Sequence, residues 1–342
     1  MRTPQCMRAR WLAVTLCAVG VSAHASGFTA RDLAVIVNDA DPLSAAIAGY
    51  YVSRRSIPPQ NVLHLRFAAG RAALPVQEFA ELHEQVLQRT PPQVQAYALT
   101  WAQPYRVGCM SITTAFAAGF DPAFCSERCT ATRWSPYYNS NSRRPFDQFR
   151  LRPTMSIAAT NLDQARQLID RGVAADRSHG SGGRAYLVRT ADRARNVRAA
   201  TYADAKLMVN GALPVETPAV APEARTDIMF YFIGIARVAG LATNRFLPGA
   251  IADHLTSFGG QLTGDAQMSS LRWLEAGATG SYGTVSEPCN LLGKFPNPGM
   301  VMKRYLAGET LIEAYWKSVA MPGQGIFIGE PLARPFGAAA GS

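Results

Sequence analysis

Two patterns of hydrophobic and polar positions alternate along most of the chain. Apolar residues recur at helical spacing on one side of several segments, around residues 43–51, 76–88, 161–173, 269–276 and 306–319. Short, continuous apolar runs of the kind found in buried parallel strands lie between them, at 33–37, 62–67, 97–101, 185–188, 229–235 and 325–329. Strands that alternate with helices predict an α/β fold, a three-layer sandwich around a mainly parallel sheet.

The start of this pattern is a clear β-α-β unit. Asp41 is placed to cap a helix, and Pro42 occupies its first turn, where a proline is tolerated. The helix is predicted to end before Ile57, which precedes two prolines. A parallel pair of strands on either side of this helix is therefore expected.

The segment 103–152 breaks the pattern. It shows little periodicity and contains several prolines and three cysteines. A loop of this length inside a compact fold is usually functional or cross-linked. We interpret residues 26–342 as a single α/β domain with an irregular, disulfide-stapled insertion at about 103–152.

Residues 1–25 have the features of a signal peptide. Three arginines precede the apolar run 11–21, and Ala23 and Ala25 give the small-x-small cleavage pattern. The run is shorter than the roughly 20 residues that a spanning helix needs. We expect an exported protein, periplasmic or extracellular, with no transmembrane segment after cleavage near Ser26.

Four of the six cysteines follow the signal peptide: Cys109, Cys125, Cys129 and Cys289. Four thiols in an oxidising compartment predict two disulfides, with three possible pairings. Of these we favour Cys125 with Cys129 and Cys109 with Cys289. A bridge at Cys289 would argue against its use as a nucleophile.

The net charge of +10 does not identify a partner. The arginines are spread along the chain, and the densest group, 184–198, is interrupted by apolar and acidic residues. Nucleic-acid binding would require a basic patch with aromatic residues or a known module, so no nucleic acid is expected. A solvated basic face is the simplest interpretation, and affinity for an anionic surface or a polysaccharide is the alternative.

The candidate chemistry lies in the stretch DHLTSFGG. On a helical turn His254 and Ser257 would share a face, and a base beside a hydroxyl is the basic arrangement of a nucleophile. Asp253 is the candidate orienting acid. The hydrolase motif G-x-S-x-G fails, because Leu255 stands where a glycine is needed. The alternative is that His254 packs in the core and Ser257 starts a tight turn.

No cofactor is expected from the remaining motifs. The glycines at 277, 280 and 283 lack the lysine of a phosphate-binding loop, and the cysteines and histidines lack zinc-site spacing. Asp39 and Asp41 follow the first predicted strand, where they could hold a cation or simply begin the helix.

Several long segments resemble a family of uncharacterised exported bacterial proteins found in species with the exosortase (PEP-CTERM) protein-sorting system. The segments that carry this resemblance are DLAVIVNDADPLS, YALTWAQPYRVGCMSITTAF, SPYYNSNSRRPF, LPGAIADHLTSFGGQL, LRWLEAGATGSYGTVSEPCN, EAYWKSV and IFIGEPLARPF. The resemblance spans nearly all of residues 26–342. It implies a context in the cell envelope and no particular reaction.

The C-terminal third also resembles gingipain-type peptidases of the caspase-like fold. In those enzymes a buried strand leads to the cysteine nucleophile. The corresponding position here falls around residues 256–258, and no cysteine lies between Cys129 and Cys289. The resemblance therefore implies a caspase-like fold whose cysteine chemistry is lost or replaced.

Two hypotheses follow, and whether the protein is an enzyme stays open between them. The first is a non-catalytic or catalytically degenerate protein that binds an envelope protein or glycan in an exopolysaccharide or protein-sorting context. The second is a peptidase-type hydrolase that uses Asp253, His254 and Ser257. The oligomeric state is not predicted by the sequence.

Overall fold

The computed structural model describes residues 27–126, 129–176, 178 and 182–337. The predicted signal peptide, residues 1–25, lies outside the described residues. Two sheets organise the chain. The large one has ten strands in the order β2-β1-β4-β7-β13-β12-β11-β10-β8-β9, and the small one has the order β3-β5-β6. The expected α/β sandwich around a mainly parallel sheet is confirmed.

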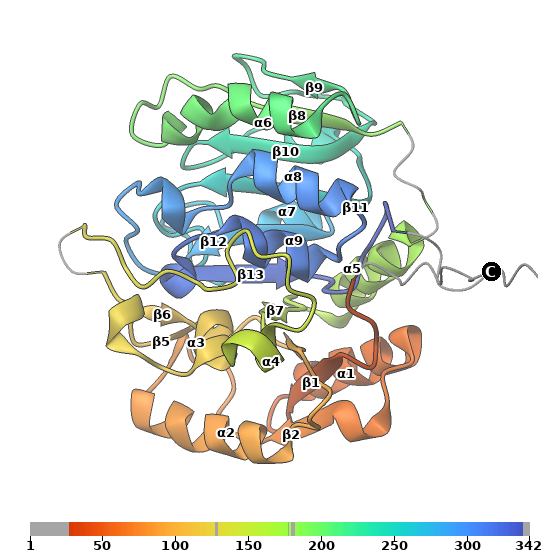
Figure 1. Ribbon diagram of the computed structural model, residues 1–342, viewed down its shortest axis with the longest axis vertical. Helices are drawn as coiled ribbons and strands as arrows, with labels where there is room; N and C mark the ends of the chain where they lie inside the picture. Colours follow the sequence, from red (N-terminus) through yellow and green to blue (C-terminus); the bar gives the residue numbers. More distant parts are fainter. Residues whose placement is uncertain (1–26, 127–128, 177, 179–181, 338–342) are drawn as a thin grey trace, which may run out of the picture.

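The first half of the chain builds one side of the large sheet and the small sheet (Figure 1). Its elements are β1 (Leu33–Asn38), α1 (Pro42–Arg55), β2 (Val62–Leu65), β3 (Ala73–Leu74), α2 (Val76–Arg89), β4 (Ala96–Leu99), β5 (Arg106–Val107), β6 (Met110–Ser111), α3 (Ile112–Ala118), α4 (Pro145–Phe149) and β7 (Thr154–Ser156).

The second half builds the other side. Its elements are α5 (Leu162–Ala175), β8 (Arg184–Leu187), α6 (Tyr202–Val209), β9 (Val215–Glu216), β10 (Ile228–Gly234), β11 (Phe246–Leu255), α7 (Leu271–Glu275), β12 (Gly280–Thr284), α8 (Pro298–Leu306), α9 (Leu311–Ser318) and β13 (Gly325–Gly329). Two 3₁₀ turns matter below, η3 (Asn196–Thr201) and η4 (Leu241–Thr243).

Strand directions divide the large sheet into two parallel runs. Neighbouring strands are parallel from β2 to β13 and again from β12 to β9, whereas β12 and β13 are antiparallel. The last strand of the chain, β13, therefore joins the two runs. Their carboxyl ends lie at opposite edges of the sheet.

Helices cover both faces of the sheet. Helices α1, α5 and α7 lie together on one face, and α3, α6, α8 and α9 cover the other. Local sequence explains where several of them begin. The carboxylate of Asp41 accepts a hydrogen bond from the Leu43 backbone N–H at 2.9 Å, as expected from its position before Pro42. Thr310 and Glu313 form a capping box at the start of α9.

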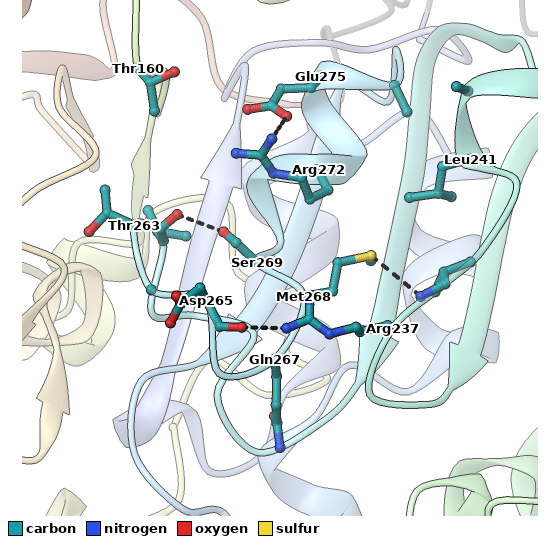
Figure 2. Close-up of a pocket in the computed structure, with 15 residues that line it drawn as sticks. Thr160, Arg237, Leu241, Thr263, Asp265, Gln267, Met268, Ser269, Arg272 and Glu275 are labelled. Carbon is teal, nitrogen blue, oxygen red and sulfur yellow. Dashed lines mark hydrogen bonds and ion pairs between the residues drawn. The ribbon is translucent and has the colours of Figure 1, made fainter.

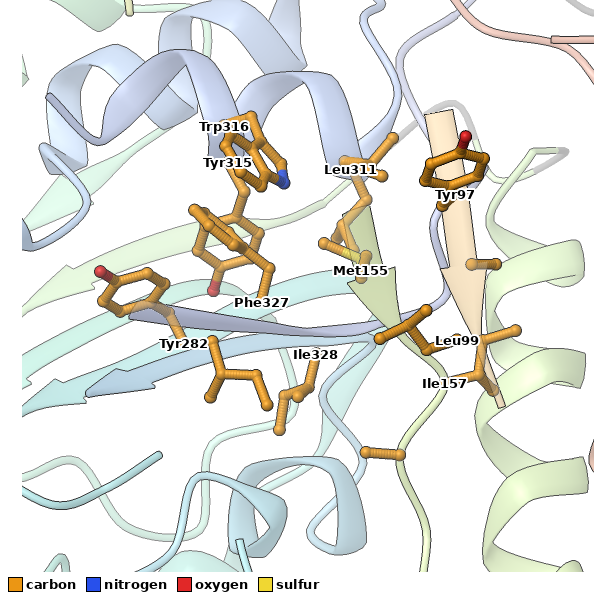
Figure 3. Packing of buried hydrophobic residues seen from close by; sticks show 14 of the residues in the cluster. Tyr97, Leu99, Met155, Ile157, Tyr282, Leu311, Tyr315, Trp316, Phe327 and Ile328 are labelled. Carbon is orange, nitrogen blue, oxygen red and sulfur yellow. The ribbon is translucent and has the colours of Figure 1, made fainter. Parts of the chain in front are cut away.

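Buried aromatic and aliphatic side chains pack around β13 (Figure 3). The ring of Phe327 stacks on Trp316 of α9, with centroids 4.5 Å apart, and meets Tyr282 of β12 edge-on at 5.1 Å. All three side chains are buried. Burial of this aromatic surface contributes to the free energy that packs α9 against β13 and β12.

Some expected elements differ from those observed. Residues 246–255 form the long strand β11, so the helical turn on which His254 and Ser257 would share a face is not formed. The helix expected at 306–319 is confined to α9, and α8 precedes it. The segment 103–152 contains the buried helix α3 as well as α4. No helix within the described ranges is long and apolar enough to cross a bilayer.

Candidate functional site

Strand β11 carries Asp253 and His254, and Ser257 lies two residues beyond its end. Consecutive residues of a strand point to opposite faces of the sheet. Asp253 accordingly contacts Arg198 of η3 on one face, and His254 contacts Trp273 of α7 on the other. The structure therefore does not place Asp253 where it could orient the ring of His254.

Both ring nitrogens of His254 are engaged. Trp273 donates its indole N–H to Nδ1 at 3.0 Å, which leaves the proton on Nε2, and Nε2 donates to the carbonyl oxygen of Met268 at 2.9 Å. The side chain is only 1% exposed. Burial lowers the pKa of His254 to about 4, so the imidazole is neutral at pH 7. A histidine held in this way supports the core and has no free nitrogen to accept a proton.

Asp253 is one half of a buried ion pair. Its Oδ1 lies 2.5 Å from Nη1 of Arg198, and both side chains are at most 2% exposed. Arg198 also donates to the carbonyl oxygen of Ile233 at 3.2 Å and lies 5.1 Å from the ring centroid of Phe232. Burial raises the pKa of Asp253 to about 6, although Arg198 opposes this shift. The pair ties η3 to β10 and β11.

Ser257 is half-buried at the carboxyl edge of the second run of strands. Its backbone carbonyl accepts a hydrogen bond from the Thr284 hydroxyl at 2.8 Å. The preceding Thr256 donates to Gln267 Oε1 at 2.7 Å and accepts from Arg195 Nε at 3.1 Å. Within the described chain, neither ring nitrogen of His254 bonds the Ser257 hydroxyl, because both have other partners.

A cavity of about 900 Å³ lies on the α7 face, beside the buried ring of His254. It is bounded by the loop after β10, by η4, by the loop 262–269 and by α7 (Figure 2). Fifteen residues line it: Thr160, Arg237, Val238, Leu241, Ala242, Leu262, Thr263, Gly264, Asp265, Gln267, Met268, Ser269, Arg272, Glu275 and Ala276. Its volume falls within the range of about 300–1,000 Å³ that is usual for ligand sites.

Charged groups line the cavity among the apolar residues. Arg272 and Glu275 form an ion pair at 2.6 Å, and a guanidinium N–H of Arg237 donates to the backbone carbonyl of Asp265 (Figure 2). Burial raises the pKa of Glu275, and Arg272 opposes that shift. Neither arginine is buried, so both can turn toward a ligand. The arrangement can bind a chain that offers both carbonyl and N–H groups.

The four cysteines form two disulfides, as predicted, but the favoured pairing is wrong. Cys109 bonds to Cys125, with Cα atoms 5.6 Å apart, and Cys129 bonds to Cys289, with Cα atoms 5.1 Å apart. Helix α3 lies between Cys109 and Cys125, and the chain turns back after it, so the two cysteines come together. Cys289 is a bridge and carries no free thiol.

The acidic pair after β1 has local partners. Asp41 caps α1, and Asp39 Oδ1 lies 2.8 Å from His64 Nδ1 on the surface. Within the described ranges, no group of three or more His, Cys, Asp or Glu side chains is placed to hold a metal ion.

Sequence reasoning missed the residues that decide the chemistry of this region. Arg198 and Trp273, the partners of Asp253 and His254, come from other elements and show no motif. The loop containing Arg237 follows the carboxyl end of a buried strand, which is where ligands bind in open α/β sheets. That rule, applied to the strand predicted at 229–235, would have pointed to the cavity.

Comparisons with known proteins give information on the fold of the chain alone. The chain is similar to a solved structure described as "Structure of Protease", with a TM-score of 0.53 and 10% sequence identity over 91% of this chain and 80% of that chain. The structural superposition shows a shared fold, which fits the caspase-like expectation, and identity as low as 10% carries no function over to this chain. No protein-family model matches the chain, and no curated protein matches its sequence.

Proposed function

We propose that this protein is an exported, non-hydrolytic binding protein on a peptidase-type fold. Its cavity beside α7 would hold an extended peptide segment of an envelope protein. The observation that carries the proposal is the state of His254, the only candidate base suggested by the sequence beside Ser257. Its two hydrogen bonds and its burial support a structural role.

The lining of the cavity supports a peptide over a glycan. Its floor contains Val238, Leu241, Leu262 and Met268, and none of its fifteen residues is aromatic. An aromatic ring offers an apolar face on which a sugar ring can stack, and this lining contains no such ring. Apolar pockets beside groups that bond carbonyls and N–H groups suit a peptide chain.

Export is part of the proposal. The leader pattern of residues 1–25 motivates it, and the two disulfides support it because such bonds persist in oxidising compartments. The resemblance to exosortase-associated proteins is the reason to look for the partner among envelope and sorting proteins.

Site-specific photo-crosslinking in the native host tests the proposal. A benzophenone amino acid at Ala242, which is exposed on the cavity rim, should give one discrete protein adduct. The same probe at Ala45, which is exposed on α1, is the matched control and should not give that adduct. Adding Ala276→Trp, which fills the cavity, should abolish the adduct. An adduct that contains only glycan, or that persists in the filled variant, would overturn the proposal.

The second candidate is the peptidase-type hydrolase that uses Asp253, His254 and Ser257. The peptidase-type fold and the half-buried Ser257 at the end of β11 favour it. It requires His254 to leave both of its hydrogen bonds. Purified protein incubated with labelled casein distinguishes the two candidates: cleavage that Ser257→Ala abolishes and Ser53→Ala, on exposed α1, leaves intact would establish the hydrolase.

A further inference from the structure

A second cavity, of about 470 Å³, lies in the first half of the chain and shares no lining residue with the first. It is enclosed by α2, α3, α4 and β4. Its lining residues are His83, Leu87, Tyr97, Phe116, Ala117, Ala118, Phe146, Arg150 and Arg152. The walls are therefore aromatic and aliphatic, and the charged groups are two arginines.

Arg152 is the unusual member of this lining. Only 4% of it is exposed, and its Nε donates to the carbonyl oxygen of Val94 at 3.1 Å. Its guanidinium carbon lies 3.2 Å from the ring centroid of Phe146 and 5.4 Å from that of Tyr97. These contacts fix the plane of the guanidinium group.

No carboxylate in the described part of the chain forms an ion pair with Arg152. Arg55 and Arg198, which are also largely buried, are paired with Glu330 and Asp253. Burial of a cation is costly and lowers the pKa of Arg152, and the nearby Asp147, which forms its own ion pair with Arg144, offsets this cost only in part. An anion that enters the cavity would remove this cost.

The neighbouring groups add positive charge and no negative charge to the lining. Arg150, exposed at the mouth, lies 5.2 Å from the Phe146 ring centroid. His83 stacks against Phe79 with ring centroids 5.3 Å apart, and burial lowers its pKa, which favours the neutral ring. The two arginines therefore define an anion site with an apolar wall beside it.

We infer that this cavity binds a small carboxylic acid with an apolar body. The carboxylate accepts hydrogen bonds from the Nη groups of Arg152, since a guanidinium fork matches the two oxygens of a carboxylate. The apolar body packs against Leu87 and Phe116, and Arg150 adds attraction at the mouth. A compact inorganic anion would leave these apolar walls uncovered, so it should bind more weakly.

Isothermal titration calorimetry on the purified protein tests the inference with 3-phenylpropionate, its neutral amide and inorganic phosphate. The acid should bind at least tenfold more tightly than either of the others. Arg152→Gln should weaken binding of the acid at least tenfold. Arg193→Gln, an exposed arginine outside both cavities, is the control and should leave it unchanged.

Substitution of the buried Arg152 could also unfold the protein, so two further variants change exposed residues of the same cavity. Arg150→Gln should weaken binding severalfold, and Ala118→Trp should block the cavity and abolish binding. Equal affinity for the acid and its amide, undetectable binding of the acid, or full binding by the Ala118→Trp protein would each overturn the inference. Tighter binding of phosphate than of the acid would also overturn it, since the apolar wall would then contribute nothing.

Discussion

Asp253 and His254 are adjacent on β11, and their side chains lie on opposite faces of the sheet with partners of different charge. Asp253 forms an ion pair with Arg198. The ring of His254 accepts a hydrogen bond from Trp273 and donates one to a backbone carbonyl, so it is neutral. Both ring nitrogens of His254 are hydrogen-bonded, whereas the ion pair leaves Asp253 Oδ2 and Arg198 Nε buried without a hydrogen-bond partner. Removal of the Arg198 or the Trp273 side chain is expected to lower the free energy of unfolding by more than the same substitution at the surface.

The pH dependence of stability reports the state of His254. The pKa of His254 falls from 6.5 in the unfolded chain to about 4 in the folded protein. Between these pH values the unfolded chain binds more protons than the folded protein. The contribution of neutral His254 to the free energy of unfolding is therefore complete above pH 6.5 and is lost as the pH falls to 4. We expect the free energy of unfolding to fall by about 3 kcal/mol over this range because of His254 alone.

Urea unfolding of the wild type and of His254→Gln, measured from pH 7 to pH 4, isolates this effect. A glutamine amide can keep one donor and one acceptor but does not titrate. Asp253, whose pKa is raised, acts in the opposite direction in both proteins and cancels in the difference. Parallel pH profiles for the two proteins would contradict the buried, neutral assignment.

At the scale of elements, periodicity and capping residues predicted the first β-α-β unit well. Strand β1, helix α1 and strand β13 lie where the apolar runs and the Asp41-Pro42 pair placed them. Strand β11 escaped prediction because Pro248, Gly249 and the polar pair at 253–254 interrupt its apolar run. Its burial on both faces is decided by distant partners, which no local pattern encodes.

The candidate site was predictable only in part for the same reason. The stretch DHLTSFGG was predicted as the candidate catalytic site, and in the structure Asp253 and His254 are buried with partners from other elements. A helical turn would have placed His254 and Ser257 on one face, whereas the extended backbone of β11 does not. Most of the first cavity is lined by residues 237–276, and the second is lined by several elements between residues 83 and 152, so the spacing of residues within one element does not reveal either lining.

Glycine is required where β12 meets the loop after β11. A Cβ at Gly283 would lie 2.5 Å from the backbone nitrogen of Gly260, which is closer than packing allows. We expect Gly283→Ala to lower the free energy of unfolding by at least about 2 kcal/mol, because the strand and the loop must separate. Thermal unfolding monitored by circular dichroism measures this effect.

Gly49 provides the matched control for this prediction. It lies within α1, and a Cβ there would meet nothing within 4 Å. Gly49→Ala should raise the free energy of unfolding by roughly 0.5–1 kcal/mol through helix propensity. If both alanine variants stabilise the protein, the close approach at Gly283 is refuted.

At the scale of the whole molecule, the two disulfides close loops of very different length. Cys129 and Cys289 are 160 residues apart in sequence, whereas Cys109 and Cys125 are 16 apart. If loop entropy of the unfolded chain dominates, the double alanine variant of the long bridge should be about 2 kcal/mol less stable than that of the short bridge. Urea unfolding compares the variants, and a non-reduced peptide map checks the pairing. Equal losses would point to native-state contacts as the source of stabilisation.

Strand β13 connects the two runs of the sheet, so we expect them to unfold as one cooperative unit. It pairs with β12 through five residue pairs, from Gly280–Gly329 to Thr284–Gly325, and with β7 on its other side. Phe327 lies at its centre, so Phe327→Ala should cost about 3–5 kcal/mol by leaving a cavity. Because β13 ends the first run and pairs with β12 of the second, we expect amide exchange to accelerate by the same factor in β4 and in β10. Leu207→Ala, at an exposed position on α6, should change neither. Acceleration confined to β10 would show that the two runs open independently and that β13 does not couple them.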